Sequence, residues 1–227
     1  MIIVRPAAGG GFEVLLNRRA QGMSFLGGFY VFPGGNVQRE DGSARLLERS
    51  VGLSPPEAQR LLGAGLPAQL ALGHWIAAVR ETFEEVGILF CVDENGKPVD
   101  LGDPERARAV AACRRRLVSR ATTFADFLQA ERLRCALGGI AYFSHWQTPA
   151  EFAARFDTRF FLALLPPGQS AAPAAGEVTE ILWLAPDDAL SSYRAGRLPL
   201  IFPTYASLRA LADFSSLESL CAEYRLR

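Results

Sequence analysis

The sequence predicts an α/β fold, and three observations support this expectation. Short apolar runs with strand character alternate along the chain with longer stretches of helical periodicity. One helical stretch, at about 72–86, leads directly into an apolar run at 88–92. With 227 residues and 49% hydrophobic content, the chain can bury one sizeable core. We therefore expect a single domain over residues 1–227.

The elements are expected in a mixed order of strands and helices. The first two strands, at 2–5 and 13–18, are joined through Gly9–Gly11, a flexible turn and not a phosphate loop, because no helix follows it. A third strand is expected at 29–32. The later segments are one or two short helices within 36–73, helices at 72–86, 104–120 and from 123, strands at 88–92, 140–146, 160–165 and 178–184, and closing helices at 186–194 and 204–214.

Composition excludes several classes of protein. Lys plus Arg and Asp plus Glu are equal at 24 each, so no bulk charge draws the chain to nucleic acid or to anionic lipid. The four cysteines are widely spaced and form no C-x-x-C pair, so we expect reduced thiols. No apolar run is long enough to span a membrane, and the apolar start at 1–4 is too short for a signal-peptide core. We expect a cytoplasmic protein.

The helix at 72–86 carries an unusual acidic face. Glu81, Glu84 and Glu85 are three and four residues apart, so they project from one side of the helix. Three clustered carboxylates raise each other's pKa unless a cation neutralises them, and Arg80 alone does not balance them. Oxygen ligands of this kind suit Mg²⁺ or Mn²⁺. The alternative is a solvated helix face held by ordinary Arg–Glu pairs.

The opposite face of the same helix is apolar. Ile76, Val79, Phe83 and Val86 recur at spacings of three and four, which predicts a stripe that faces a core. Gly87 follows the last of these residues, where a left-handed cap favours glycine. The acidic face therefore belongs to a helix that is anchored by its back.

A glycine-rich turn, Pro33–Gly35, follows the apolar run at 29–32. Together with the acidic helix, this turn resembles the signature of the Nudix hydrolases, G-x5-E-x7-R-E-U-x-E-E-x-G-U, in which U is a bulky apolar residue. The match is close from Arg80 to Ile88, with Thr82 at a position usually held by a larger apolar residue. The resemblance implies an α/β/α sandwich with a mixed sheet, and a metal-dependent hydrolase that cleaves a diphosphate linked to another moiety.

The resemblance also implies roles for individual residues. The implied catalytic residues are Arg80, Glu81, Glu84 and Glu85, and the implied ligands of Mg²⁺ or Mn²⁺ are Glu81, Glu84, Glu85 and the carbonyl of Gly35. Glu81, held by Arg80, is either a third metal ligand or the general base, because the family varies in where its base lies. Glu177 and Glu180 are spare candidates for the base.

The chain departs from the Nudix box in its first half. The segment between Gly34 and Arg80 is much longer than in the standard box, which indicates an insertion, mostly helical, at about 36–73. Counting forward from Gly34 puts the first glutamate of the box at Glu40, whereas counting back from Arg80 puts it at Leu72. We therefore expect this outer glutamate to be displaced or absent.

Further segments resemble the subset of Nudix enzymes that hydrolyse coenzyme A. Leu15–Ala20 followed by Gly28–Gly35 is similar to the coenzyme A signature that precedes the box, with Asn17 where threonine is usual. Coenzyme A carries a 3′-phosphate besides its diphosphate, so a binder needs extra cations and a surface for adenine. The candidate substrate-binding residues are Arg18, Arg19, Arg155 and Phe32. The alternative for each arginine is a surface salt bridge, and aromatic residues beside strands are more often part of a core.

Three functional hypotheses follow. The first is a diphosphatase of coenzyme A or acyl-coenzyme A, which yields 3′,5′-ADP and (acyl-)phosphopantetheine. The second is a Nudix hydrolase of ADP-ribose, NADH or a dinucleotide. The third is a Nudix-fold ligand-binding protein without turnover, which the intact glutamate trio argues against. Each hypothesis has a small-molecule partner, with neither nucleic acid nor membrane, and a homodimer stays open.

Overall fold

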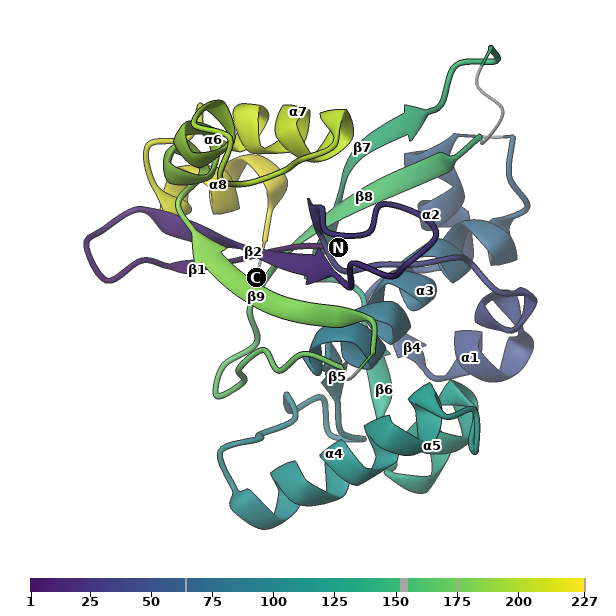
Figure 1. The fold of residues 1–227 in the computed structure, drawn as a ribbon. Coiled ribbons are helices and arrows are strands. Elements are labelled where there is room, and N and C mark those ends of the chain that lie inside the picture. The colour runs from purple at the N-terminus through teal and green to yellow at the C-terminus, as the bar shows by residue number, and fades with distance from the viewer. Residues whose placement is uncertain (64, 152–154, 175, 227) are drawn as a thin grey trace.

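A mixed six-stranded sheet lies between two layers of helices in the computed structural model (Figure 1), which describes residues 1–63, 65–151, 155–174 and 176–226. The strand order is β3-β2-β1-β8-β7, and β9 also pairs with β2. The strands are β1 (Ile2–Pro6), β2 (Phe12–Arg19), β3 (Tyr30–Val31), β7 (Ile140–Gln147), β8 (Asp157–Leu164) and β9 (Val178–Leu184). Only β1 and β8 pair in parallel; the other pairs in this sheet are antiparallel.

The two faces of the sheet supply two apolar cores. Side chains alternate along a strand, so Ile3 and Leu15 face one core while Ile2 and Leu16 face the other. All four side chains are fully buried. The sheet is therefore covered on both faces, which is the expected α/β/α sandwich.

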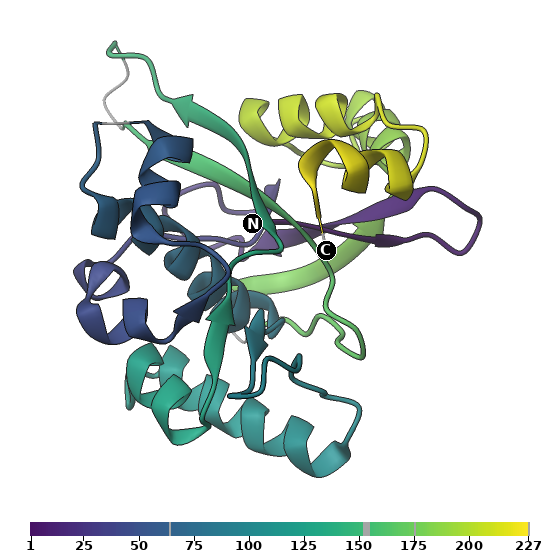
Figure 2. The same ribbon diagram turned by 180° about the vertical axis from the view of Figure 1, so that it is seen from behind.

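One core is closed by the helices at the end of the chain. These are α6 (Pro186–Arg194), α7 (Phe202–Leu211) and α8 (Leu217–Tyr224). Seen from behind, they lie together on one side of the sheet and the remaining helices on the other (Figure 2). Leu208, Leu211 and Leu220 are fully buried in this core.

The other core is built on α3 (Ala68–Val86), a helix of 19 residues. Its apolar stripe is buried as expected, and Trp75 donates a hydrogen bond from its indole nitrogen to the carbonyl of Ile140 at 3.0 Å. This bond fixes α3 to β7. Between β3 and α3 lie η1 (Arg39–Gly42), α1 (Ala44–Glu48), β4 (Ser50–Val51) and α2 (Pro55–Leu62).

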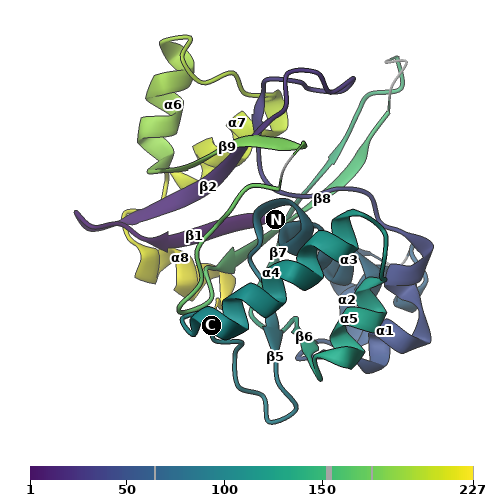
Figure 3. The same ribbon diagram turned by 60° about the horizontal axis from the view of Figure 1, so that its bottom comes forward.

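A second, small sheet lies beyond α3. It has the order β4-β6-β5, with β5 (Cys91–Val92) and β6 (Arg134–Ala136), and α4 (Pro104–Val118) and α5 (Phe124–Ala130) lie beside it. In Figure 1, α4 and α5 lie below α3, on the side away from the large sheet, and with the bottom of the molecule turned forward they come to the front beside α3 (Figure 3). The chain thus surrounds α3 with structure on several sides.

Most predicted elements are confirmed within a few residues, and the strand expected at 88–92 is the main correction. Only Cys91–Val92 is paired as a strand. Before it, the side-chain amide of Gln169 takes the place of a neighbouring strand: it accepts from the nitrogen of Leu89 at 2.8 Å and donates to the carbonyl of Leu89 at 2.9 Å. The helix α8 and the strands β4 and β6 were not predicted. Among the described residues, no helix combines the length and hydropathy needed to cross a lipid bilayer.

Candidate active site

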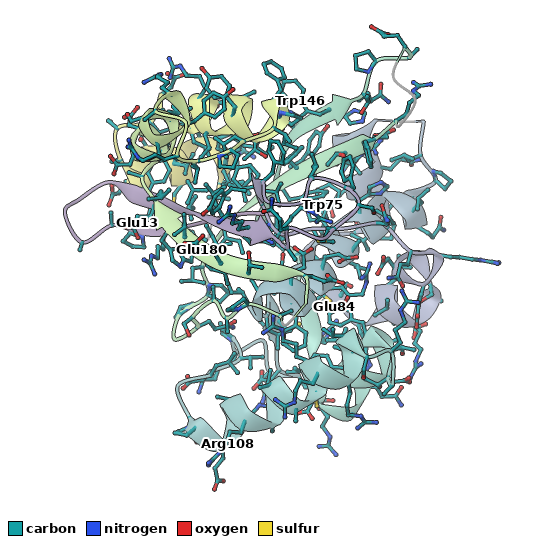
Figure 4. The ribbon with its side chains drawn as sticks, in the orientation of Figure 1. Glu13, Trp75, Glu84, Arg108, Trp146 and Glu180 are labelled. Atoms are coloured by element: carbon teal, nitrogen blue, oxygen red, sulfur yellow. The ribbon has the colours of Figure 1, made fainter. Side chains whose placement is uncertain are left out.

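The C-terminal half of α3 carries the acidic face. The helix ends at Gly87, whose φ of 74° is the left-handed cap that the sequence predicts, and whose nitrogen donates to the carbonyl of Phe83. Because Phe83 and Val86 are fully buried, the glutamates of the opposite face are held rigidly against the rest of the molecule. Figure 4 shows Glu84 on this helix, in the space between β9 and the helices α4 and α5.

Arg80 is the centre of an ion-pair network. Its side chain is only 5% exposed, and it donates from Nε and Nη2 to the two carboxylate oxygens of Asp41, both at 2.9 Å. It also donates from Nη1 to Glu81 at 2.7 Å and lies 3.5 Å from Glu84. Burial disfavours the charged guanidinium, but the bonds and charges of Asp41 and Glu81 outweigh this effect and raise the pKa of Arg80.

Asp41, and neither of the two positions considered for the outer glutamate, is the buried acidic partner of Arg80. It is 1% exposed on η1 and also accepts from the nitrogen of Gln38 at 2.7 Å. Glu40, the position found by counting forward, is exposed at the rim, and Leu72, found by counting back, is in the core. Sequence reasoning missed Asp41 because the long segment between Gly34 and Arg80 leaves no fixed spacing to count from. The available signal was an acidic residue next to Glu40 in a short turn.

Glu85 is the most deeply buried of the three glutamates, at 5% exposure. Its Oε2 accepts from the nitrogen of Gly34 at 2.9 Å and from the amide of Asn17 at 3.3 Å. Burial raises its pKa to about 7, since the hydrogen bond from Gly34 and the nearby positive charges only partly offset the loss of water. The ionised carboxylate of Glu85 is thus under-compensated by the protein.

Gly35 allows the turn after β3 to approach the glutamates. A Cβ at this position would lie 2.5 Å from the carboxylate carbon of Glu81, so a larger residue would displace that carboxylate. The resemblance to the Nudix hydrolases implies that the Gly35 carbonyl is a metal ligand. The structure brings the backbone of Gly35 to Glu81, and its ligand role stays a prediction.

A cavity of about 680 Å³, here called the glutamate cavity, opens beside these groups. Its wall includes Glu81, Glu84 and Glu85 on one side and Leu117, Val118 and Phe124 on another. Burial raises the pKa of Glu81 and of Glu84, in spite of the charge of Arg80. Since Asp41 already engages two donor groups of Arg80, the trio keeps an excess of negative charge that faces the cavity.

This donor set suits a hard divalent cation. Carboxylate oxygens at the edge of a wet cavity are the ligands that Mg²⁺ and Mn²⁺ prefer. Within the described parts of the chain, however, no three acidic, cysteine or histidine side chains are arranged to hold a metal ion as they stand. The reason is visible, since Glu81 is turned to Arg80 and Glu85 to Gly34. Metal binding therefore requires these carboxylates to exchange protein donors for the ion.

Comparison with known proteins decides the family. The model of the NUDT19 Nudix domain matches residues 3–211 of this chain. The chain belongs to this Nudix family. A solved Nudix hydrolase from Alicyclobacillus acidocaldarius is 31% identical, with a TM-score of 0.75 over 97% of this chain and 92% of that one. The predicted Nudix fold and the predicted class of enzyme, a Nudix-type hydrolase, are confirmed.

Curated relatives share the same domain. An acyl-coenzyme A diphosphatase NUDT19 of Xenopus laevis is 27% identical over 239 residues, which cover 92% of this chain and 62% of the relative. The human protein of the same name is 29% identical over 244 residues, covering 95% of this chain and 64% of the relative. The chain thus spans slightly less than two thirds of the length of these relatives.

A second cavity, of about 670 Å³, adjoins the glutamate cavity in this Nudix hydrolase. Both are lined by Arg19 and by the turn at 34–36, so the turn and this arginine separate them. We call the second one the aromatic cavity, because Phe25 and Phe156 lie in its wall. It lies on the side of the turn away from Glu84 and Glu85, which line only the first cavity.

The four candidate substrate-binding residues fall in different places. Arg19 lines both cavities and Arg155 lines the aromatic cavity. Arg18 lies over the ring of Tyr30 and 3.9 Å from Glu180, and Phe32 is buried against Phe160. The structure therefore brings Arg19 and Arg155 to one cavity and places Arg18 and Phe32 outside both cavities. The substrate-binding role of all four residues stays a prediction.

The spare candidates for the general base are also separated. Glu177 lines the glutamate cavity, whereas Glu180 accepts a hydrogen bond from the hydroxyl of Tyr30 at 2.5 Å. Of these two residues, Glu177 alone shares a cavity with the glutamate trio.

Proposed function

We propose that this Nudix hydrolase is a divalent-metal-dependent diphosphatase of coenzyme A or acyl-coenzyme A. The products would be 3′,5′-ADP and (acyl-)phosphopantetheine. The observation that carries the chemistry is the trio of half-buried and buried glutamates that faces a cavity with too little positive charge. The relatives named acyl-coenzyme A diphosphatase support the choice of substrate.

The residues would have two kinds of role, metal binding and the positioning of the metal ligands. Glu84 and Glu85, with Glu81 and the Gly35 carbonyl, would hold Mg²⁺ or Mn²⁺, which supplies charge neutralisation of the diphosphate and lowers the pKa of bound water. Arg80 keeps the carboxylate of Glu81 at the cavity wall, and Asp41 keeps Arg80 in place.

The two cavities would orient the substrate. Arg19, at the junction of the two cavities, can pair with a phosphate oxygen of the diphosphate. The turn at 34–36 lies between the two cavities, so a diphosphate that crosses this turn would lie beside the glutamates.

Hydrolysis of a small panel tests this proposal. Coenzyme A, an acyl-coenzyme A, ADP-ribose, NADH and a diadenosine polyphosphate are incubated with Mg²⁺ or Mn²⁺, and the products are separated by chromatography. We expect the coenzyme A compounds to give the highest kcat/KM and 3′,5′-ADP as a product. A preference for ADP-ribose or a dinucleotide would reject the substrate but keep the catalytic helix, and the absence of turnover on every compound would reject the proposed diphosphatase.

A further inference from the structure

We propose that the aromatic cavity binds the 3′-phosphorylated adenosine half of the substrate, and that the pantetheine arm leaves through the glutamate cavity. This inference rests on the proposed function, and it assigns a direction to the substrate. Three features of the cavity carry it: an exposed aromatic pair, an excess of arginine, and a shared boundary with the catalytic glutamates.

The aromatic pair is formed by Phe25 and Phe156. Their ring centroids are 4.3 Å apart with an interplanar angle of 27°, and they remain 42% and 40% exposed. Two large apolar rings from segments far apart in the sequence thus meet at a cavity wall without being buried. Flat exposed rings of this kind are suited to stacking with a nucleobase, whose faces are aromatic as well.

The charge of the cavity favours a phosphorylated ligand. Its wall holds three arginines, Arg19, Arg155 and Arg159, and among the described wall residues a single carboxylate, Asp157. Arg159 donates to Asp157 at 2.8 Å, and its Nε is buried with no hydrogen-bond partner in the described chain. Arg155 is exposed and forms no ion pair with any residue that the structure describes.

Arg19 is the third cation. Its Nε donates to the carbonyl of Phe25 at 3.2 Å, which fixes the side chain beside the aromatic pair. The terminal nitrogens of its guanidinium then remain for the ligand, at the point where the two cavities meet.

The two halves of coenzyme A differ in the properties that this cavity selects. The nucleotide half has a purine and a 3′-phosphate, whereas the pantetheine arm beyond the diphosphate has neither an aromatic ring nor a charge. The wall of the glutamate cavity at Leu117, Val118 and Phe124 offers apolar surface that suits the uncharged arm. With the diphosphate at the turn 34–36, each half faces the cavity that matches it.

Binding of the product halves tests the direction without turnover. Isothermal titration calorimetry, in metal-free buffer, measures the Kd of 3′,5′-ADP, AMP and 4′-phosphopantetheine for the wild-type protein, Arg155→Ala and Phe156→Ala. We expect Arg155→Ala to raise the Kd of 3′,5′-ADP by about tenfold and the Kd of AMP much less, because only 3′,5′-ADP has a 3′-phosphate. We expect Phe156→Ala to raise the Kd of both nucleotides by the same factor and to leave the Kd of phosphopantetheine unchanged.

Matched controls come from a distant face. Phe202 is 67% exposed and Arg209 pairs with Asp213, and neither lines a cavity described above, so Phe202→Ala and Arg209→Ala should bind as the wild type does. Melting curves confirm that all variants are folded. The inference is overturned if the wild-type protein does not bind 3′,5′-ADP or if both cavity variants bind it with wild-type affinity. It is also overturned if the two variants lose affinity for phosphopantetheine instead.

The same variants separate this inference from the proposed function. If the wild-type protein binds 3′,5′-ADP through Arg155 and Phe156 but does not hydrolyse coenzyme A, the proposed function fails while the nucleotide site stands. If coenzyme A is hydrolysed and the ratio of kcat/KM for coenzyme A to that for 3′-dephospho-coenzyme A does not fall in Arg155→Ala, the site fails while the function stands.

Discussion

Asp41 and Arg80 are the residues on which the geometry of the acidic cluster depends. Without Asp41, the buried guanidinium of Arg80 would lose the carboxylate that accepts two of its hydrogen bonds. Without Arg80, Glu81 would lose the donor that holds its carboxylate. The ion pair thus links η1, in the long segment between β3 and α3, directly to the acidic face of α3. The segment that the sequence predicts as an insertion thus supplies the buried partner of Arg80.

Replacement of this aspartate gives the first prediction. We expect Asp41→Asn to lower the free energy of unfolding by about 3 kcal/mol, because the substitution leaves the buried guanidinium without its full counter-charge. Denaturant unfolding measures the change. Glu40→Gln is the matched control, since Glu40 is exposed, and it should change the stability by less than about 0.5 kcal/mol. Equal effects of the two substitutions would contradict the assignment of Asp41.

At this scale the sequence predicts the acidic trio but not its partner. The glutamates repeat with the period of a helix, so a local pattern reveals their common face. Asp41 reaches Arg80 only through the fold of the segment between them, which no spacing encodes. The stacking of Phe25 on Phe156 was not predicted for the same reason.

At the scale of elements, the end of α3 is held by α4. Arg114 donates from its Nε to the carbonyl of Glu84 at 3.1 Å, and a Cβ at Gly87 would lie 2.8 Å from the Nη1 of Arg114. The guanidinium therefore lies against the cap of the helix, and a side chain at Gly87 would displace it. This contact fixes the backbone of the residues that face the cavity.

A pair of glycine substitutions tests this contact. Gly87 and Gly96 have similar φ angles, 74° and 81°, but a Cβ at Gly96 would meet nothing within 4 Å. We expect Gly96→Ala to cost about 1 kcal/mol of stability from backbone strain and to keep full activity. Gly87→Ala should cost more and also lower kcat, because it displaces Arg114 and the end of α3. Identical melting temperatures and rates for the two variants would contradict this role of the contact.

Element prediction succeeded where a local period exists. The stripe of α3 and its glycine cap were both found in the sequence. Of the small sheet, only β5 lies within a predicted strand; β4 and β6 were missed because they have only two and three residues, too few for an alternating pattern. The pairing of Gln169 with Leu89 joins residues far apart in the chain, so it could not be predicted either.

At the scale of the whole molecule, the protein keeps an unfavourable cluster of charge beside two adjoining cavities. Burial raises the pKa of Glu81, Glu84 and Glu85, so their ionised forms cost stability in the metal-free protein. A bound divalent cation would remove this cost. The order of strands and helices predicts the α/β class, and the resemblance to the Nudix hydrolases implies the α/β/α sandwich. The meeting of two cavities at 34–36, in contrast, depends on the complete fold.

Metal binding should therefore stabilise the folded protein. We expect Mn²⁺ to raise the melting temperature of the wild-type protein by several degrees, because a ligand that binds only the folded state stabilises it by mass action. Glu84→Gln should lose most of this response. Glu180→Gln is the matched control and should respond as the wild type does, since Glu180 bonds to Tyr30 and lines neither cavity. A shift that survives in Glu84→Gln would place the metal elsewhere.

The most direct test of the central claim is the rate of coenzyme A hydrolysis by Glu85→Gln, measured with saturating Mg²⁺. Glutamine has the shape of glutamate and its oxygen can still accept from Gly34, so we expect a folded protein whose kcat falls by about 10²-fold or more from the loss of one charged ligand. Wild-type activity in this variant would contradict the account, because the buried carboxylate on α3 would then have no part in the reaction.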